Sequence, residues 1–451
     1  MNNKGYRLAP TLIRAAIVSA LGGLLFGFDS AVIAGTTNAL RQIFSLTDWQ
    51  VGFVVSSALV GTVLGTLVFT KPADIWGRRN NLKVLAVLFF VSAIGCSLAW
   101  DMWSLVFFRF LGGLGIGGAS VLGPMYVAEI SPAKVRGRLV ILFQYNVCVG
   151  ILVAFFSNAL IQTMGFNVLQ MEWRVMLGVG SLPALIFFIT LFGIPESPRW
   201  LVAKERYQEA EKVLALVGEE NISQEMEEIK QSLHVTEHKT NERLFQKKYA
   251  YVIFLGVGVA AFNQLSFVNG FLYYLNDTLK NIGATFGGKF QPVIIGVANV
   301  IAVTLALLTI DKIGRKTLLL IGSWGSAIPL ALCAYIAYTR THIDLFPWCL
   351  ADFILFFSYS QGSVIWVYIS EIFPNRVRSK GQSLGSFTHW GLCTIAALVY
   401  PTVVAIKEVG LAIPFVFGGI VMIIQFFVVL FFFVETKGVP LEEMEKKLGI
   451  K

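Results

Sequence analysis

The sequence contains little charge. Only 14% of its 451 residues are Asp, Glu, Lys or Arg, whereas about a quarter are charged in a typical soluble domain. Histidine occurs four times and cysteine five times, and the cysteines lie in apolar runs without forming a close pair. The shortage of charge excludes an ordinary soluble fold. The lack of Cys and His clusters argues against a metal or redox centre. The sequence also shows no pair of a nucleophile and a base that would indicate an enzyme.

Long apolar runs take the place of the missing charge. Hydrophobic residues make up 56% of the chain, and the mean hydropathy is +0.70. A helix needs about 20 apolar residues to cross a bilayer, and the runs lack the alternation of barrel strands. They therefore predict an all-α polytopic membrane protein with twelve transmembrane helices, at about 11–35, 50–70, 82–100, 103–127, 138–162, 173–194, 250–276, 290–310, 316–338, 345–370, 382–404 and 411–434.

The basic residues predict the orientation. If the N-terminus is cytoplasmic, only six of the 36 Lys and Arg residues lie in or near external loops. The other 30, apart from Arg109, fall in cytoplasmic segments, which is the positive-inside bias. The net charge of +9 is thus explained by topology and not by nucleic-acid binding, since no basic cluster alternates with exposed aromatics. Both termini are predicted to be cytoplasmic, with a retained first helix.

One half of the chain repeats the other. The turn Asp-x-x-Gly-Arg-Arg at 74–79 returns as Asp-x-x-Gly-Arg-Lys at 311–316, 237 residues later. Two further motifs, which contain Glu129 and Glu196, return after 242 and 239 residues. A unit present twice in the same orientation is typical of secondary transporters.

The repeat divides the chain into four parts. Residues 1–194 and 249–434 are each predicted to form a six-helix bundle. The polar stretch 195–248 contains two short amphipathic helices and is predicted to be a cytoplasmic linker, and 435–451 is a cytoplasmic tail. The stretch 277–290 is expected to be an external loop.

Eight motifs together resemble the sugar porter family of the major facilitator superfamily. They cover essentially the whole chain in family order, and include GGLLFGFDSAVIAG (22–35), RFLGGLGIG (109–117), PESPRWL (195–201) and NQLSFVNGFLYY (263–274). The resemblance is to bacterial proton-coupled monosaccharide symporters. It implies two six-helix bundles around a central sugar site that opens alternately to each side, with the middle stretch as a small cytoplasmic helical domain.

The glycines at 113–118 match the pattern G-x-G-x-x-G. A dinucleotide site needs a preceding strand and a βαβ unit, whereas these glycines lie in a helix-length apolar run. We predict that they let two membrane helices approach closely.

Two charges lie within apolar spans. Asp29 in span 1 and Arg109 in span 4 would each cost at least about 2.5 kcal/mol alone, so they are predicted to be neighbours. The residues alone leave open a static ion pair or a proton switch. The resemblance favours the switch, because proton-coupled members carry Asp at this position. The coupling ion is then the proton, and no cofactor is expected.

Sugar recognition is predicted from amides and aromatic rings at mid-membrane depth. Amides both donate and accept hydrogen bonds, and an aromatic face covers the C–H side of a sugar ring. For the tryptophans, packing or anchoring at the membrane interface is the alternative role. For His389, a packing role is as plausible as contact with sugar or titration. The candidate binding residues are Phe26, Gln144, Asn263, Gln264, Asn269, Asn299, Trp366, His389 and Trp390, and Tyr273 and Tyr274 resemble an external gate.

Four residues depart from the family pattern. Asn263 stands where Gln is common, Ser363 where Pro is common, and His389 where an amide is common. Phe267 replaces a usual Gly, and its ring is expected to narrow the cavity or to alter the bend of span 7. Gly270 and the family pattern predict that bend, which would let Asn263, Gln264 and Asn269 face inward together.

Charges repeat at the cytoplasmic ends of both halves. Their sign and order recur, which random loop charges would not do. We hypothesise a salt-bridge network that holds the cytoplasmic ends together in the outward-open state. It comprises Arg78, Arg79, Glu129, Arg136, Glu196 and Arg199 in the first half and Arg315, Lys316, Glu371, Arg378 and Glu435 in the second.

The predicted function is transport of a monosaccharide, a hexose or pentose, by proton symport. A facilitative uniporter is the alternative within the same fold, and a sugar sensor is the alternative of another class, although the short tail argues against it. The expected partners are the sugar and membrane lipid, with the protein monomeric. The short loops, and cysteines that show no pattern typical of disulfide bonds, agree with a location in a bacterial inner membrane.

Overall fold

The computed structural model describes residues 9–132, 136–165, 169–219, 221–237, 242–284, 287–374, 376–438, 444 and 447–448. Across these residues the chain is helical. The prediction of an all-α polytopic membrane protein is confirmed, because twelve helices are long and apolar enough to cross a membrane. They span Pro10–Gly35, Asp48–Val68, Arg78–Ser97, Met102–Ile130, Leu142–Thr163, Met171–Gly193, Lys247–Tyr273, Gly288–Ile313, Arg315–Thr339, Ile343–Ile372, Arg378–Val404 and Ile413–Phe432.

In the first half of the chain, the described residues form nine α-helices. They are α1 (Pro10–Val32), α2 (Thr37–Ile43), α3 (Asp48–Val68), α4 (Thr70–Trp76), α5 (Arg78–Ser97), α6 (Met102–Ile130), α7 (Arg136–Thr163), α8 (Leu169–Val179) and α9 (Ser181–Thr190). The connecting segment contains α10 (Pro198–Ala203), α11 (Tyr207–Val217) and α12 (Ile222–Glu237).

The second half repeats this plan with more breaks in its helices. It contains α13 (Ala250–Leu265), α14 (Val268–Tyr273), α15 (Leu275–Ile282), α16 (Gln291–Ile313), α17 (Arg315–Thr339), α18 (Phe346–Phe357), a π-helical turn (Ser358–Gly362), α19 (Ser363–Ile372), α20 (Arg378–Val404) and α21 (Ile413–Phe432).

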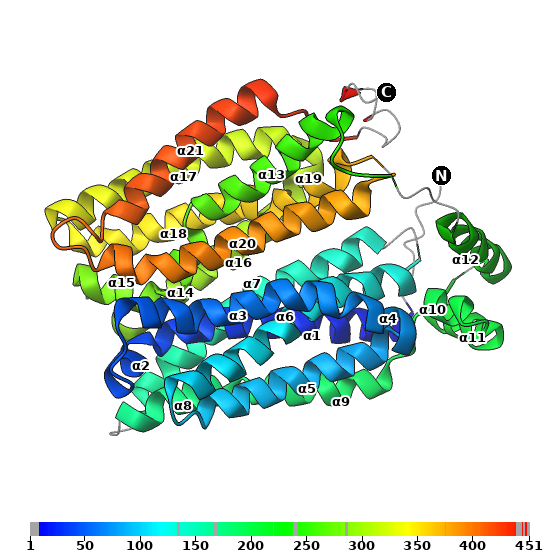
Figure 1. Cartoon of the computed structure of the whole chain (residues 1–451), viewed down its shortest axis with the longest axis horizontal. Coiled ribbons are helices and arrows are strands. Elements are labelled where there is room, and N and C mark those ends of the chain that lie inside the picture. Colours follow the sequence, from blue (N-terminus) through cyan, green and yellow to red (C-terminus); the bar gives the residue numbers. More distant parts are fainter. Residues whose placement is uncertain are drawn as a thin grey trace.

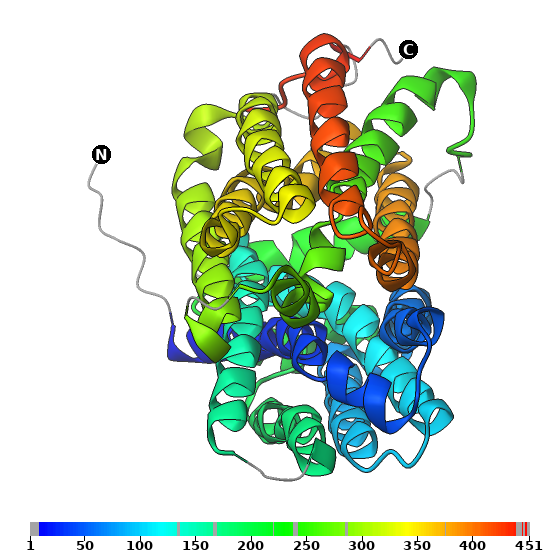
Figure 2. The same cartoon turned by 90° about the vertical axis from the view of Figure 1, so that its left-hand side faces the viewer.

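The two halves form two bundles that lie side by side (Figures 1 and 2). They touch along α3 and α20 and along α7 and α16. A methyl group on Gly52 would overlap the Leu398 carbonyl oxygen, so α3 and α20 are in backbone contact. Helices α10 to α12 lie at one end of the molecule, beyond α4, and α2, α8 and α15 lie at the other (Figure 1).

The glycines of α6 allow close packing against α3, as predicted. A methyl group on Gly113 would overlap the carbonyl oxygen of Ala58, and one on Gly117 would overlap that of Thr62. The chain therefore needs glycine here for helix contact, which agrees with small residues at membrane helix interfaces.

The repeated turns have the same structure in both halves. Gly77 and Gly314 have φ values of 92° and 100°, which L-residues with a side chain rarely adopt. A side chain at either glycine would also collide with a carboxylate, that of Glu196 or of Glu435. Helix α10 packs beside the first turn, where Trp200 Nε1 donates to the Asp74 carbonyl oxygen at 3.0 Å. Helices α11 and α12 pack on α10.

Candidate sugar site and charge pair

A central cavity of about 130 Å³ lies between the bundles. This volume is large enough for several water molecules, because one water molecule needs about 10–15 Å³ on the same measure. All nine candidate binding residues line it. They come from α1 (Phe26), α7 (Gln144), α13 (Asn263 and Gln264), α14 (Asn269), α16 (Asn299), α19 (Trp366) and α20 (His389 and Trp390).

Gln264 is the centre of a hydrogen-bonded amide cluster. Its Nε2 donates to Asn263 Oδ1 at 3.0 Å, and its Oε1 accepts from Asn269 Nδ2 at 2.9 Å. Gln264 Nε2 also lies 3.1 Å from Nε2 of His389. Only 1% of Gln264 is exposed. Buried polar groups are costly without partners, so this cluster stabilises the inward-facing amides and fixes their positions.

Aromatic rings form the wall next to the amides. The Phe26 and Trp390 centroids are 5.5 Å apart, although the two residues belong to different bundles. The His389 ring lies 5.0 Å from that of Trp366 and 4.9 Å from that of Trp390. His389 therefore packs between tryptophans and also faces an amide. The geometry accommodates both roles considered for this residue, and its role stays a prediction.

The bend in span 7 occurs at Ser266 and Phe267, four and three residues before Gly270. Phe267 has φ 61° and ψ 15°, in the left-handed region. The expectation that its ring narrows the cavity is wrong, because Phe267 is not among the lining residues. Its ring centroid instead lies 5.5 Å from that of Phe417 and 6.4 Å from that of Tyr400. The residue affects the site through the backbone, by ending α13 so that Asn263, Gln264 and Asn269 face one space.

We expect Phe267→Gly to be more stable than Phe267→Ala. Both changes remove the same ring contacts, but only glycine adopts the left-handed conformation without a steric cost, which is about 1–2 kcal/mol for other residues. Thermal unfolding of the two variants in detergent measures the difference. Equal melting temperatures, or a more stable alanine variant, would contradict a left-handed backbone at this position.

Asp29 and Arg109 are neighbours, as predicted. Arg109 Nη1 lies 3.3 Å from Asp29 Oδ2, and 2% of the arginine side chain is exposed against 21% of the aspartate. A void of about 10 Å³, large enough for about one water, adjoins both residues. Phe26 and Tyr273 line this void and also the central cavity. Ser30 lines both as well, so three residues connect the charge pair to the amide site.

The two candidate gate residues occupy different surroundings. Tyr273 lines the central cavity, and its hydroxyl is 3.9 Å from Cys393 Sγ. Tyr274 does not line it; its hydroxyl donates to the Ala397 carbonyl oxygen at 2.8 Å, and its ring stacks on Tyr400 at 5.2 Å. Their gating role stays a prediction.

The charges that are predicted to be cytoplasmic form two matching clusters, one in each half. In the first, Arg78 binds Glu129 through two bonds of 2.9 and 3.0 Å, and Glu196 accepts from the backbone N–H groups of Arg78 and Arg79. In the second, Arg315 Nη2 donates to Glu371 at 2.9 Å, and Glu435 accepts from the backbone of Arg315 and Lys316. The described residues show no ion pair between the two clusters.

Two other residues assigned to this network take different positions. Arg378 donates to the Phe373 carbonyl oxygen at 3.3 Å, within the second half. Arg199 forms no ion pair with a described residue. The side chain of Arg136 lies outside the described residues. The proposed link across the halves therefore stays a prediction about another conformation.

Asp277 was not recognised from the sequence. The expectation of a loop over 277–290 is wrong at its start, because Leu275–Ile282 forms α15. Asp277 Oδ1 accepts from Asn38 Nδ2 of the other half at 2.7 Å. Burial raises the pKa of the Asp277 carboxyl above its ordinary value, and the Thr37 hydroxyl and the Arg41 charge oppose this effect. The strong amphipathic pattern of this segment could have revealed the helix.

The fold and the central cavity define a membrane transporter with two repeated bundles. A family model described as "Sugar (and other) transporter" matches residues 15–448. The chain belongs to this family, the sugar porters of the major facilitator superfamily. The expectation of a transporter and not an enzyme is confirmed by this membership.

Similar proteins include proton symporters. The chain is 35% identical to the arabinose-proton symporter of Bacillus subtilis, over 96% of this chain and 94% of that protein. It is 34% identical to the D-xylose-proton symporter of Escherichia coli strain K12, over 95% and 94%.

Solved structures of the xylose transporter XylE from E. coli share the fold. The inward-open conformation matches with a TM-score of 0.85 and 31% identity, over 97% of this chain and 99% of that chain. XylE bound to 6-bromo-6-deoxy-D-glucose matches with a TM-score of 0.79 and 33% identity, over the same shares. By TM-score, the structure is thus more similar to the inward-open form of XylE than to the form bound to 6-bromo-6-deoxy-D-glucose.

Proposed function

We propose that this protein carries a monosaccharide across a bacterial inner membrane together with a proton, by alternating access of one central site. The observation that carries this proposal is the shared lining of two sites. Phe26 and Tyr273 border both the amide cavity and the void beside Asp29 and Arg109. Occupation of the sugar site can therefore change the surroundings of the charge pair directly.

The amide cavity fits a polyhydroxy ligand. Gln144, Gln264 and Asn299 come from three different helices and offer both donors and acceptors. Phe26 and Trp390 offer apolar faces for the C–H side of a sugar ring. Pentoses and hexoses are the substrate class, in agreement with relatives that carry arabinose and xylose.

The charge pair supplies the coupling. Protonation of Asp29 removes the negative partner of Arg109. The arginine is then a buried positive charge that needs another hydrogen-bond acceptor. Because an unpaired buried charge is costly, the protein is expected to change conformation when the proton binds or leaves. A pair that only stabilised the bundle would show no dependence of transport on protonation.

Purified protein in liposomes that contain a pH-sensitive dye tests the proposal. Hexoses and pentoses are added one at a time, and we expect at least one to cause internal acidification together with sugar entry. Sugar entry without proton movement would make the protein a uniporter. Sugar binding without entry would identify a sensor.

We further propose that the termini and both charge clusters face the cytoplasm, that the protein is monomeric, and that this structure represents an inward-facing state. The greater similarity to inward-open XylE supports the last point. In the outward-open state the cytoplasmic ends approach, and the clusters around Arg78 and Arg315 then face each other.

We expect Glu129→Gln to shift the protein towards the inward-facing state. The change leaves Arg78 with fewer negative partners, so the cytoplasmic ends hold together less well. Since ion pairs near a surface contribute about 0–1 kcal/mol each, the shift should be up to about fivefold in the conformational equilibrium. Labelling of Ile151→Cys, a cavity residue, by an external impermeant thiol reagent should slow by this factor. Glu211→Gln, an exposed residue of α11, is the matched control, and equal rates for both variants would refute the latch.

A further inference from the structure

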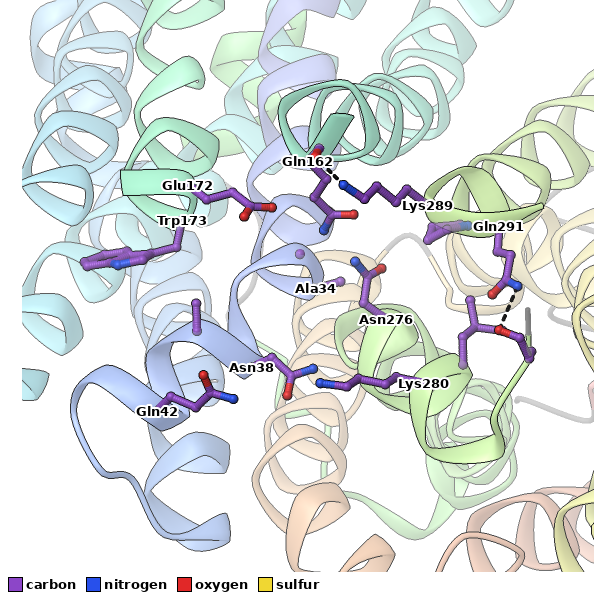
Figure 3. A pocket seen from close by; sticks show the side chains of 16 residues that line it. Ala34, Asn38, Gln42, Gln162, Glu172, Trp173, Asn276, Lys280, Lys289 and Gln291 are labelled. Carbon is purple, nitrogen blue, oxygen red and sulfur yellow. Dashed lines mark hydrogen bonds between the residues drawn. The ribbon is translucent and has the colours of Figure 1, made fainter. Parts of the chain in front are cut away.

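A second and larger cavity lies at the end of the molecule opposite α10 to α12. This outer cavity has a volume of about 420 Å³, about three times that of the central cavity. Its walls come from both halves: α2, α7 and α8 on one side, and α15 and α16 on the other (Figure 3). It is distinct from the amide site, since the two cavities have no lining residue in common.

The lining of the outer cavity is rich in groups that bind hydroxyls. Five carboxamides, two ammonium groups and one carboxylate line it: Asn38, Gln42, Gln162, Asn276, Gln291, Lys280, Lys289 and Glu172. Figure 3 shows Gln162, Glu172 and Asn276 pointing towards one space. Amides and ammonium groups donate, and amides and the carboxylate accept. This mixture suits a neutral polyhydroxy ligand, whereas an anion would face the Glu172 carboxylate.

Two hydrogen bonds between the halves frame the cavity. The Lys289 ammonium group donates to the Gln162 carbonyl oxygen, and Asn38 donates to Asp277 at 2.7 Å. The cavity in this form therefore exists only while the ends of the two bundles are together. A ligand that touches both walls stabilises that closed arrangement.

One lining residue carries a buried acceptor that lacks a partner among the described residues. It is Asn276 Oδ1, and Figure 3 shows the Asn276 amide pointing into the cavity. A buried polar atom without a partner costs about 1–3 kcal/mol. A small rotation of this amide allows a ligand hydroxyl to donate to Oδ1. The indole of Trp173 points away from the cavity and packs on Phe44, so it offers the ligand no hydrogen bond.

We propose that the outer cavity is a second carbohydrate site, which binds a neutral saccharide of up to disaccharide size and keeps the outer end closed. The proposal rests on the topology under the proposed function, which places this end outside the cell. It does not depend on proton coupling or on transport. A saccharide bound here would reduce the rate of uptake without competing for the central site.

Protection from alkylation tests the site. Gln42→Cys places a thiol on an exposed lining residue, and the purified full chain in lipid nanodiscs is treated with a hydrophilic maleimide, with and without 100 mM maltose. We expect maltose to slow alkylation at least about threefold. The rate falls in proportion to the fraction of protein without bound ligand, and that fraction is about a third or less when the maltose concentration is at least about twice its Kd. The control is Thr341→Cys, an exposed residue outside the cavity, where maltose should have no effect. Wild-type labelling is subtracted for the native cysteines.

Two further variants make the test specific. Asn276→Leu in the Gln42→Cys background should abolish protection, and Gln162→Ala provides a second wall variant if the first is not monodisperse. Gln264→Ala alters only the central site and should leave protection intact. Equal alkylation with and without maltose overturns the proposal, and so does protection that Gln264→Ala removes. Failure of the proposed transport function would appear in the liposome assay and would leave these alkylation rates unchanged.

Discussion

Asp29→Asn is expected to abolish uphill sugar accumulation while sugar still equilibrates across the membrane. Asparagine keeps the size of the side chain and can still accept a hydrogen bond from Arg109, but it cannot take up a proton. One proton per sugar with a pH difference of one unit supports about a tenfold accumulation, since one unit is worth 1.36 kcal/mol. The variant should reach a ratio of one, measured with labelled sugar in liposomes under an imposed pH gradient.

Counterflow and a matched acid separate this result from misfolding. Asp29→Asn should still exchange labelled for unlabelled sugar without a gradient, which shows an intact site. Asp352→Asn changes an exposed acid of α18 and should leave accumulation at the wild-type level. Full accumulation by Asp29→Asn would make its pair with Arg109 purely structural. Loss of both accumulation and counterflow would show that the carboxylate is needed for the fold or for sugar binding.

Much of the fold follows from the length of the apolar runs. A run of about 20 residues can satisfy its backbone in lipid only as a helix, so the number and approximate position of the spans could be predicted. The proximity of Asp29 and Arg109 could be predicted for a similar reason, because two isolated charges in a membrane cost much more than a pair.

Other features depend on backbone geometry that residue types do not reveal. Phe267 occupies a left-handed position at the break between α13 and α14. Its ring packs on Phe417 and Tyr400 and does not line the cavity, so of its two expected effects only the one on the bend of span 7 remains. The hydrogen bond of Asp277 with Asn38 of the other half depends on helix α15, which was expected to be a loop and therefore could not be predicted. The repeat of the charged residues predicted that they form ion pairs with one another. It did not indicate whether these pairs form within one half or between the two halves. In this state each cluster is internal, because Glu129 and Glu371 lie next to the turn of their own repeat.

The amide cluster gives the second large expected effect. Gln264 is bonded to Asn263 and Asn269 and contacts His389, so it both lines the site and orients its neighbours. Gln264→Ala removes one amide from the sugar and leaves the Asn269 amide without its acceptor. Each neutral hydrogen bond contributes about 0.5–1.5 kcal/mol, and an unsatisfied partner costs about 1–3 kcal/mol. We therefore expect KM for the transported sugar to rise about 10- to 100-fold.

A comparison of two glutamines distinguishes binding from stability. Gln425→Ala truncates an equally buried amide in α21 that does not line the cavity, so it should leave KM within about twofold, as expected for a side chain that does not touch the ligand. Gln264→Asn keeps the amide on a shorter arm and should give an intermediate KM. If Gln264 only held α13 and α14 in place, both Gln264 variants would lower the melting temperature and the maximal rate with KM unchanged. A rise in KM that follows the length of the amide arm, at a melting temperature close to that of Gln425→Ala, is the result that a direct contact with sugar requires.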